Sequence, residues 1–421
     1  MIDIIDVEEV LTLADYGAVA HLAGAVQRLR AEAELLVPAF RGRTVWMVNS
    51  TERGGGVAEM MPRLVSVMRE LGIDTRWAVI RTDRPAFFDF TKRLHHLIHG
   101  AGDPRITSEN RALYDEVSRR CADAMRPELK PKDVVIIHDP QPMGMGALLK
   151  RTAELTCIWR CHIGSEERNQ ATRAAWRFLG PHAAVYDHAV FSAPEYIPDC
   201  LAGRSTIIHP AIDPLSHKNR ELSPHKLMGI LCNAGLARAP APVLTPPFRQ
   251  RAQRLQADGS FATATAPEEI GLAYRPTVLQ VSRWDRLKGW DGVLNAFVTL
   301  KRQARKRRIG DERHQHRLRI VRLILAGPDP ASIQDDPEAE QVLDSLKARF
   351  LSLEPEIQQD IVLLTLPMAS RKENALMVNV LQRCSTVAVQ NSIREGFGLT
   401  ATEAMWKRTA VLGTQASGLR V

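Results

Sequence analysis

Long apolar runs and a basic leader are both missing from this sequence. No apolar stretch approaches the roughly 20 residues that a helix needs to span a bilayer. Residues 1–9 carry acidic side chains, where a signal peptide carries basic ones. These absences exclude a membrane-spanning protein and predict a cytoplasmic location.

Cysteine is scarce and scattered. Only Cys157 and Cys161 lie near each other, and no second pair stands at the spacing of zinc ligands. The pattern predicts reduced thiols, no structural metal and no cofactor. The six cysteines are Cys121, Cys157, Cys161, Cys200, Cys232 and Cys384.

Basic residues outnumber acidic ones, but no nucleic-acid module accompanies them. The net charge is +8, and much of the excess lies in residues 301–308 and in the arginines just after them. This run has no interleaved aromatic side chains. Of the two interpretations, a solvated helix end and a nucleic-acid surface, the first is favoured. We therefore expect no nucleic-acid partner.

Length and composition indicate a globular protein with more than one domain. The 421 residues are 45% hydrophobic and 25% charged, enough for two apolar cores. Short apolar segments alternate with segments of helical period, and the alternation occurs twice, which predicts an α/β protein with two doubly wound, Rossmann-like domains. Strands are predicted at 44–49, 76–80, 134–137, 156–160, 278–281, 321–326, 361–366 and 387–390, and helices at 57–71, 289–300 and 399–406.

The domain boundaries follow from this alternation and from proline. The first domain is predicted at 1–215, with a helical N-terminal extension at 1–42. Residues 216–275 include a proline-rich passage, so we expect a linker without a core of its own. The second domain is predicted at 276–421.

Polar residues follow the predicted strands of the first domain. His138, Asp139 and Gln141 follow one strand, and Arg160 and His162 end the next. A single histidine at such a place is usually structural, but two at adjacent strand ends indicate a polar pocket. Ligands of parallel sheets bind beyond these ends.

A glycine run precedes the first predicted helix of this domain. Gly54, Gly55 and Gly56 let the backbone approach a ligand and present amides to an oxygen or a phosphate. Their spacing is not the dinucleotide-binding pattern, and a tight turn between strand and helix is the alternative interpretation.

The second domain offers charges at corresponding places. Arg283 and Lys288 follow one strand and suit the two phosphates of a nucleotide. Glu395 and Glu403 bracket a glycine-rich turn at a helix start, where backbone amides point at an anion. The alternative is that both are ordinary helix-terminus and surface charges. The turn itself contributes Gly396, Phe397, Gly398, Leu399 and Thr400.

These motifs resemble the GT-B retaining glycosyltransferases of family 4, and within them the trehalose synthases of the glycosyltransferring type. The likeness runs from about residue 43 to residue 418. Its motifs are 48–51 (VNST), 54–59 (GGGVAE), 138–142 (HDPQP), 159–163 (WRCHI), 212–216 (IDPLS), 280–285 (QVSRWD) and 392–400 (SIREGFGLT).

The resemblance implies transfer of glucose from a nucleoside-diphosphate glucose to glucose, giving trehalose with retained configuration. The two domains would then face each other across a cleft. Arg283 and Lys288 would bind the diphosphate, Glu395 the glucosyl hydroxyls and Glu403 the ribose. His162 would contact the transferred sugar.

The same resemblance assigns the remaining groups to the substrates. Gly55 and Gly56 would approach the donor diphosphate and the acceptor, whereas His138, Asp139 and Gln141 would lie on the acceptor side.

Two alternatives stay open. A retaining trehalose phosphorylase would use inorganic phosphate at the same anion site. A sugar-nucleotide-binding module without turnover is the third hypothesis, because the chain ends at Val421 while relatives continue, so the second domain is expected to be incomplete. An uncovered sheet edge would favour a homodimer.

Overall fold

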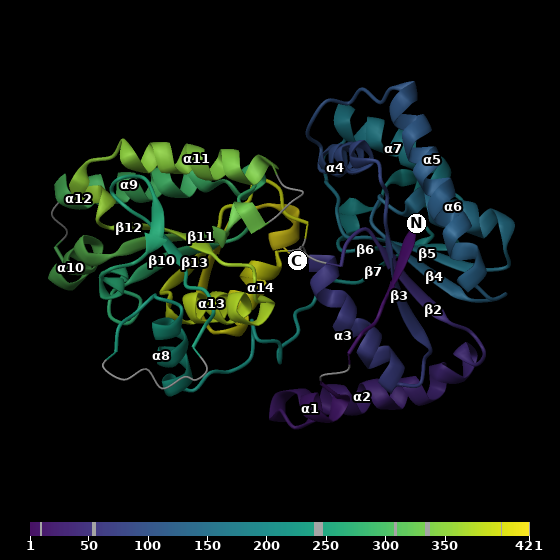
Figure 1. Cartoon of the computed structure of the whole chain (residues 1–421), viewed down its shortest axis with the longest axis horizontal. Helices are drawn as coiled ribbons and strands as arrows, with labels where there is room; N and C mark the ends of the chain where they lie inside the picture. Colours follow the sequence, from purple (N-terminus) through teal and green to yellow (C-terminus); the bar gives the residue numbers. More distant parts are fainter. Residues whose placement is uncertain are drawn as a thin grey trace. The chain divides into compact units, whose positions relative to one another are not determined.

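The computed structural model describes residues 1–8, 11–52, 56–239, 247–306, 310–332, 337–396 and 398–420. The chain divides into two compact units, Met1–Ala211 and Ile212–Arg420. Each unit contains one seven-stranded sheet between helices (Figure 1). The predicted pair of doubly wound α/β domains is confirmed.

The sheet of the first unit is almost entirely parallel. Its strand order is β1-β3-β2-β4-β5-β6-β7, and β1 alone runs antiparallel to its neighbour. The strands are β1 (Ile2–Ile5), β2 (Val45–Asn49), β3 (Thr75–Ile80), β4 (Val134–His138), β5 (Thr156–Cys161), β6 (His188–Phe191) and β7 (Ser205–Ile207). The helices are α1 (Leu13–Gly17), α2 (Ala20–Leu36), α3 (Gly56–Glu70), α4 (Pro85–Ile98), α5 (Ser108–Met125), α6 (Met143–Thr152) and α7 (Gln170–Ala183).

Both faces of this sheet are buried because its strands carry apolar residues at consecutive positions. Trp46 and Val48 belong to a core shared with α4, α5, α6 and α7. Val45 and Met47 point to the opposite face, where they pack with α3. This three-layer arrangement sets the carboxyl ends of the parallel strands along one edge.

The N-terminal extension is helical from Leu13 onward, as predicted, but it begins with a strand that was not predicted. Residues Ile2–Ile5 form an edge strand, which pairs with β3 from Ile2 opposite Ile80 to Ile5 opposite Trp77. The helices start only at Leu13. The exposed edge of β3 offers unpaired backbone groups, and the short β-branched segment satisfies them.

The second unit has strand order β14-β13-β10-β11-β12-β8-β9, and only the pairs involving β8 are antiparallel. Its strands are β8 (Gln253–Leu255), β9 (Phe261–Thr263), β10 (Thr277–Val281), β11 (Arg322–Pro328), β12 (Ile361–Leu366), β13 (Val387–Gln390) and β14 (Ala410–Gly413). Its helices are α8 (Pro224–Asn233), α9 (Trp290–Lys306), α10 (Glu312–Ile320), α11 (Pro337–Leu351), α12 (Pro355–Gln358), α13 (Arg371–Cys384) and α14 (Leu399–Trp406).

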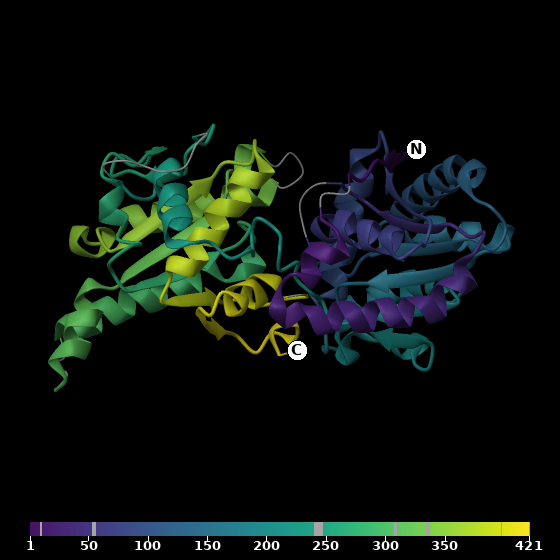
Figure 2. The same ribbon diagram turned by 90° about the horizontal axis from the view of Figure 1, so that it is seen from below.

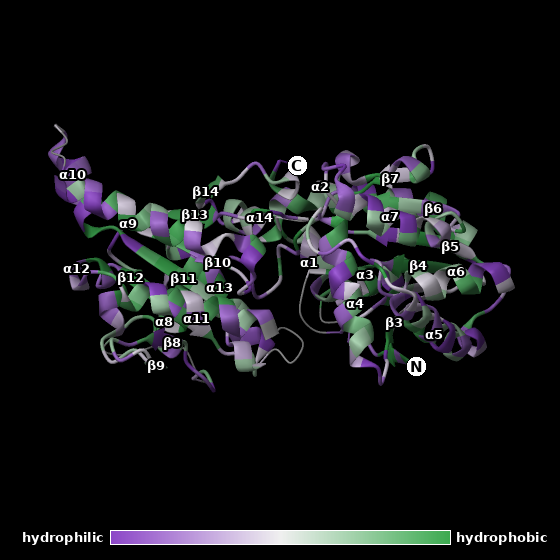
Figure 3. Ribbon diagram, turned by 90° about the horizontal axis from the view of Figure 1, so that it is seen from above, coloured by the Kyte–Doolittle hydropathy of each residue, from purple (hydrophilic) through white to green (hydrophobic). Residues whose placement is uncertain are grey.

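The second sheet is also covered on both faces. Leu279 and Val281 pack with α8 and α13, whereas Leu323 and Leu325 pack with α9, α11 and α12. The central strands are accordingly hydrophobic in Figure 3, while α10 is largely hydrophilic. Helix α10 lies at one end of the unit, beside the end of α9 (Figure 2).

The segment predicted to be a linker contributes to this second unit. Strand β8 pairs with β12, and β9 pairs with β8, so the two strands extend the sheet. Leu231 and Ala252 are buried in the core between α8, α13 and the sheet. Apolar side chains on both sides of the prolines therefore have a surface to pack on. The described boundary lies between Ala211 and Ile212, ahead of the predicted one at 215.

None of the helices in the described ranges combines the length and the apolar composition that crossing a membrane requires.

Candidate active site

An ion pair lies at the carboxyl edge of the second sheet. Lys288 ends the short helix Arg286–Lys288 after β10, and Glu395 lies in the loop after β13. Strands β10 and β13 are parallel neighbours, so both loops leave the same edge. The Lys288 Nζ donates to Glu395 Oε2 at 2.7 Å, and the two side chains are only 15% and 10% exposed.

Buried polar side chains hold the two loops against each other. Gln280 is buried within β10; its Nε2 donates to the Lys288 carbonyl at 3.0 Å, and its Oε1 accepts from the Asn391 amide at 3.3 Å. The Asn391 side chain donates to the Gly289 carbonyl at 2.8 Å. Gly289 has φ +63, and a Cβ there would meet the Asn391 carbonyl oxygen at 2.2 Å. Glycine is therefore required where the loops meet.

Three donors converge on one oxygen of Glu395. Besides Lys288, Gln390 Nε2 and Ser392 Oγ donate to Oε2 at 3.0 Å and 2.8 Å. Burial by itself raises the pKa of Glu395, but the charge and hydrogen bond of Lys288, with the hydrogen bonds from Ser392 and the Gly398 amide, lower this pKa to about 2. The carboxylate is ionised at neutral pH.

Arg283 supplies a more accessible cation at the same edge. It follows β10, its side chain is 51% exposed, and its guanidinium lies 3.8 Å from Asp285 Oδ2. Its backbone is held by the Trp290 indole, which donates to the Arg283 carbonyl at 3.2 Å. The position is therefore fixed while the guanidinium faces solvent.

The glycine-rich turn leads into α14, as the sequence predicts. Gly398 is the N-cap with φ 67, Leu399 and Thr400 form the first turn of the helix, and Phe397 lies outside the described residues. The Gly418 amide donates to the Glu395 carbonyl at 2.9 Å, next to Gly396. The segment after β14 thus packs on the turn.

Glu403 lies within α14 and is buried. Its Oε1 lies 3.8 Å from Lys218 Nζ, and its carboxylate side chain is 8% exposed. Lys407 Nζ donates to the Glu403 carbonyl and to the side chains of Asn219 and Gln382 at 3.0, 2.9 and 2.7 Å. Burial lowers the pKa of Lys407 to about 7, although the charge of Glu403 opposes the shift.

In the first unit the structure brings His138 and His162 together. His138 ends β4 and His162 follows β5, and both are buried. The His138 Nδ1 to His162 Nε2 distance is 2.9 Å, with ring planes 10° apart and centroids 5.2 Å apart. The centroid separation exceeds the nitrogen distance by about two ring radii, so the rings lie edge to edge and share one in-plane hydrogen bond.

Asp139 has a strained backbone beside this histidine pair. Its φ is 63, which is uncommon for a residue other than glycine. Its Oδ1 accepts from the His162 amide at 2.8 Å, and its carbonyl accepts from the Trp159 indole at 3.0 Å. Burial raises the pKa of Asp139 to about 7, against the effect of the His162 amide and the Arg160 charge.

The remaining predicted residues of the first unit are placed as follows. Gly56 starts α3, whereas Gly54 and Gly55 lie outside the described residues. Arg160 is half-buried in β5. Within the described ranges, nothing hydrogen bonds to the buried atoms His138 Nε2 and Gln141 Oε1.

Sequence reasoning missed the residues that hold these groups. Gln280, Gln390 and Ser392 organise the Lys288–Glu395 pair, and Lys218 lies beside Glu403. Gln280 and Gln390 are polar residues within otherwise apolar strands, and that was the available signal.

Comparison with known proteins places the chain in a family. A model of the trehalose synthase N-terminal domain matches residues 47–198, and one of glycosyl transferases group 1 matches residues 266–421. A trehalose synthase from Thermococcus litoralis is 33% identical over 398 residues, which cover 94% of this chain and 79% of that protein. The chain belongs to the trehalose synthase family. Another member, from Rubrobacter xylanophilus, is 32% identical over 411 residues, covering 97% and 82% of the two chains.

Solved structures agree with this family at the level of fold. A structure titled "OtsA apo structure" matches with a TM-score of 0.59 at 16% identity and covers 90% of this chain and 85% of its own. The UDP-forming α,α-trehalose-phosphate synthase from Burkholderia vietnamiensis matches with a TM-score of 0.57 at 14% identity, covering 90% and 84%. The predictions of a GT-B fold and of a glycosyltransferase are confirmed.

We predict that Lys288 and Glu395 depend on each other for stability. Lys288→Met leaves a buried carboxylate without its cation, and we expect the free energy of unfolding to fall by about 3 kcal/mol. Adding Glu395→Gln removes the unpaired charge and should recover much of that loss in urea unfolding.

The exposed pair of Arg302 and Glu354, at 2.8 Å, is the matched control and should show little coupling in the same double-mutant cycle. If the changes in the free energy of unfolding from the Lys288 and Glu395 single variants add up to that of the double variant, the prediction is contradicted.

We further predict a pH dependence from the histidine pair. Burial, then nearby charge, lowers the pKa of His138 and of His162 well below 6.5. As pH falls below 6.5, the two histidines bind protons in the unfolded chain but stay neutral in the folded one. The free energy of unfolding therefore decreases as pH falls. Asp139 acts oppositely as pH falls below 7, because its raised pKa favours the protonated folded form.

Urea unfolding between pH 7 and 5 tests this, with His138→Gln/His162→Gln as the comparison. Wild type should lose more stability than the variant, by about 2 kcal/mol for each histidine over these two pH units, and the difference should grow more steeply below pH 6.5 than above it. Parallel pH profiles would count against neutral, buried histidines.

Proposed function

We propose that this chain is a retaining glycosyltransferase that moves glucose from a nucleoside-diphosphate glucose to free glucose and so makes trehalose. The observation that carries the proposal is the Lys288–Glu395 pair beside Arg283, at the carboxyl edge of the second sheet. In open α/β sheets this edge is where ligands bind. Family membership supplies the sugar chemistry.

The two cations suit the diphosphate of the donor. Arg283 presents a half-exposed guanidinium, which can bind phosphate through two parallel hydrogen bonds. Lys288 is a point charge in a nearly dry site, where its attraction for a developing negative charge is stronger than in water. Together they would stabilise the leaving diphosphate as the glycosyl bond breaks.

The two glutamates have different places in this proposal. Glu395 is ionised and fixed by three donors, so it can accept hydrogen bonds from hydroxyls of the transferred glucose. Glu403 is assigned to the ribose. Its carboxylate is buried beside Lys218, so a ribose bound there would lie next to that ammonium group.

The histidine pair is assigned to the sugars. His162 would contact the transferred glucose, and His138, Asp139 and Gln141 would contact the acceptor. Backbone strain at Asp139 and the buried polar atoms His138 Nε2 and Gln141 Oε1 support a ligand role for this strand edge. Gly55 and Gly56 are assigned to the donor diphosphate and the acceptor.

The proposed reaction balances without a covalent intermediate on the protein. The bond between the anomeric carbon and the phosphate oxygen breaks, and the acceptor hydroxyl oxygen bonds to the same face of that carbon. The acceptor proton passes to the departing phosphate, so configuration is retained. This route differs from the paired carboxylates of most retaining hydrolases.

A trehalose phosphorylase is the second candidate. A trehalose phosphorylase from Pleurotus sajor-caju is 27% identical over 393 residues, which cover 88% of this chain and 48% of that protein. Inorganic phosphate would occupy the site of Arg283 and Lys288 in that reaction. The ribose role assigned to Glu403 favours the synthase.

The deciding assay combines glucose with each common nucleoside-diphosphate glucose, while trehalose plus phosphate is incubated in parallel. We expect trehalose and one free nucleoside diphosphate to appear in equal amounts. Glucose 1-phosphate in the parallel reaction would instead establish the phosphorylase. If folded protein forms neither trehalose nor glucose 1-phosphate, the chain is a sugar-nucleotide-binding module without turnover.

Arg283→Gln separates function from folding. The side chain is half exposed, so we expect an unchanged urea midpoint and a fall in kcat/KM of about 10²–10³. Arg286→Gln is the control in the same loop, because that side chain is 69% exposed and pairs with Glu338 at 3.3 Å. An equal fall in kcat/KM for the two variants would show that Arg283 does not bind the diphosphate.

A further inference from the structure

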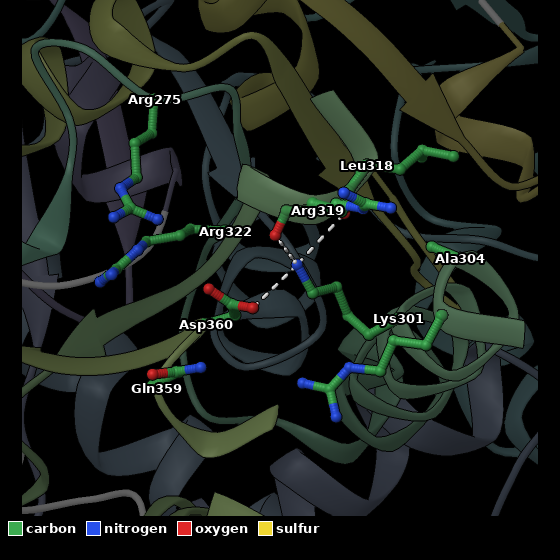
Figure 4. A pocket seen from close by; sticks show the side chains of 9 residues that line it. Arg275, Lys301, Ala304, Leu318, Arg319, Arg322, Gln359 and Asp360 are labelled. Atoms are coloured by element: carbon green, nitrogen blue, oxygen red, sulfur yellow. Dashed lines mark hydrogen bonds and ion pairs between the residues drawn. The ribbon is translucent and has the colours of Figure 1, made fainter. Parts of the chain in front are cut away.

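A basic pocket lies at the opposite edge of the second sheet (Figure 4). Its volume is about 390 Å³. Arg322 begins β11, Asp360 directly precedes β12 and Arg275 lies just ahead of β10. These strands are parallel, so their starts share the edge away from Lys288 and Glu395. The charged lining residues are Arg275, Lys301, Arg305, Arg319, Arg322 and Asp360.

Lys301 and Asp360 form a fixed pair in this pocket. Lys301 Nζ lies 2.8 Å from Asp360 Oδ2 and donates to the carbonyls of Leu318, Arg319 and Val321 at 3.2, 2.7 and 3.2 Å. The sequence predicted that the basic run at 301–308 is a solvated helix end. Lys301, the first residue of this run, is instead buried. The charges of Lys301 and Asp360 cancel, so this pair adds no net charge to the pocket.

The four arginines carry an unbalanced positive charge. Within the described ranges, none of Arg275, Arg305, Arg319 and Arg322 has an ion-pair partner. Among the described residues, Arg305 and Arg322 donate to backbone carbonyls alone, those of Glu356 and Glu269. Like charges around one hollow repel one another, and an anion bound between them would offset that repulsion.

Arg322 is the strongest indication of a missing partner. The residue is 7% exposed, and its Nε is buried without a hydrogen-bond partner among the described residues. Burial, and then the charge of Arg275, lower its pKa, while Asp360 acts in the opposite sense. In Figure 4 the guanidinium groups of Arg275 and Arg322 point to the same side of the pocket.

We propose that this pocket binds a small phosphate-class anion, separate from the sugar-nucleotide site. Guanidinium groups bind phosphate oxygens through paired hydrogen bonds, and the volume lies within the range of small-molecule sites. In the described part of the chain, no aromatic side chain lines the pocket, which disfavours the stacking that single-stranded nucleic acids use. The bound anion would contact Arg305 on α9, Arg319 on α10 and Arg322 at the start of β11.

Protection mapping on the full chain locates the anion. The protein is treated with phenylglyoxal, which modifies accessible arginines, with and without pyrophosphate, and the modified peptides are identified by mass spectrometry. We expect protection of Arg275 and Arg319, which line the pocket, and no protection of Arg313 and Arg317, which do not. This readout is independent of phosphate bound near Lys288.

Calorimetric titration then measures affinity for pyrophosphate, inorganic phosphate and glucose 6-phosphate. Arg275→Gln/Arg319→Gln should weaken binding at least tenfold, whereas the charge-matched control Arg313→Gln/Arg317→Gln should not. If inorganic phosphate binds as tightly as glucose 6-phosphate, the ligand of the pocket is a free anion. If glucose 6-phosphate binds more tightly, the ligand is a phosphorylated metabolite. Both results support the site. No protection of Arg275 and Arg319, equal weakening in the two double variants, or binding of an oligonucleotide alone would overturn it.

Discussion

Burial of two opposite charges at one strand edge constrains the second unit. Lys288 and Glu395 are both nearly dry, so each is tolerated only because the other lies within hydrogen-bond distance. That distance depends on Gln280, which binds both loops, and on Gly289, where a side chain would collide with Asn391. The ionised Glu395 carboxylate therefore depends on how Gln280 and Gly289 hold the two loops together. Arg283 extends from one of these loops.

The regular elements of this arrangement could be predicted from the sequence because apolar runs and turn residues agree there. The strands Ile361–Leu366 and Val387–Gln390 and the helix Leu399–Trp406 have the predicted bounds. The short strands β1, β8 and β9 could not be predicted, because each has three or four residues and none shows the long apolar run that marks β12. Their formation depends on an exposed strand that is available for pairing.

The site shows the same division between local pattern and tertiary contact. Motif positions indicated that His138 and His162 end adjacent strands, but not that their rings share a hydrogen bond. Buried glutamines that bind backbone groups of other segments leave no spacing signal. The basic run was visible as composition, whereas the pocket it lines needs Arg275 and Arg322, which are distant in sequence.

Binding of nucleoside diphosphates against monophosphates of the same base tests the central claim most directly. By calorimetry, the account predicts that the diphosphate binds at least about tenfold more tightly, the equivalent of one charge-assisted hydrogen bond. It also predicts that this preference is lost in Lys288→Gln/Glu395→Gln, which removes both charges together. Equal affinities in the wild type, or an unchanged preference in the double variant, would contradict a diphosphate site built on Lys288.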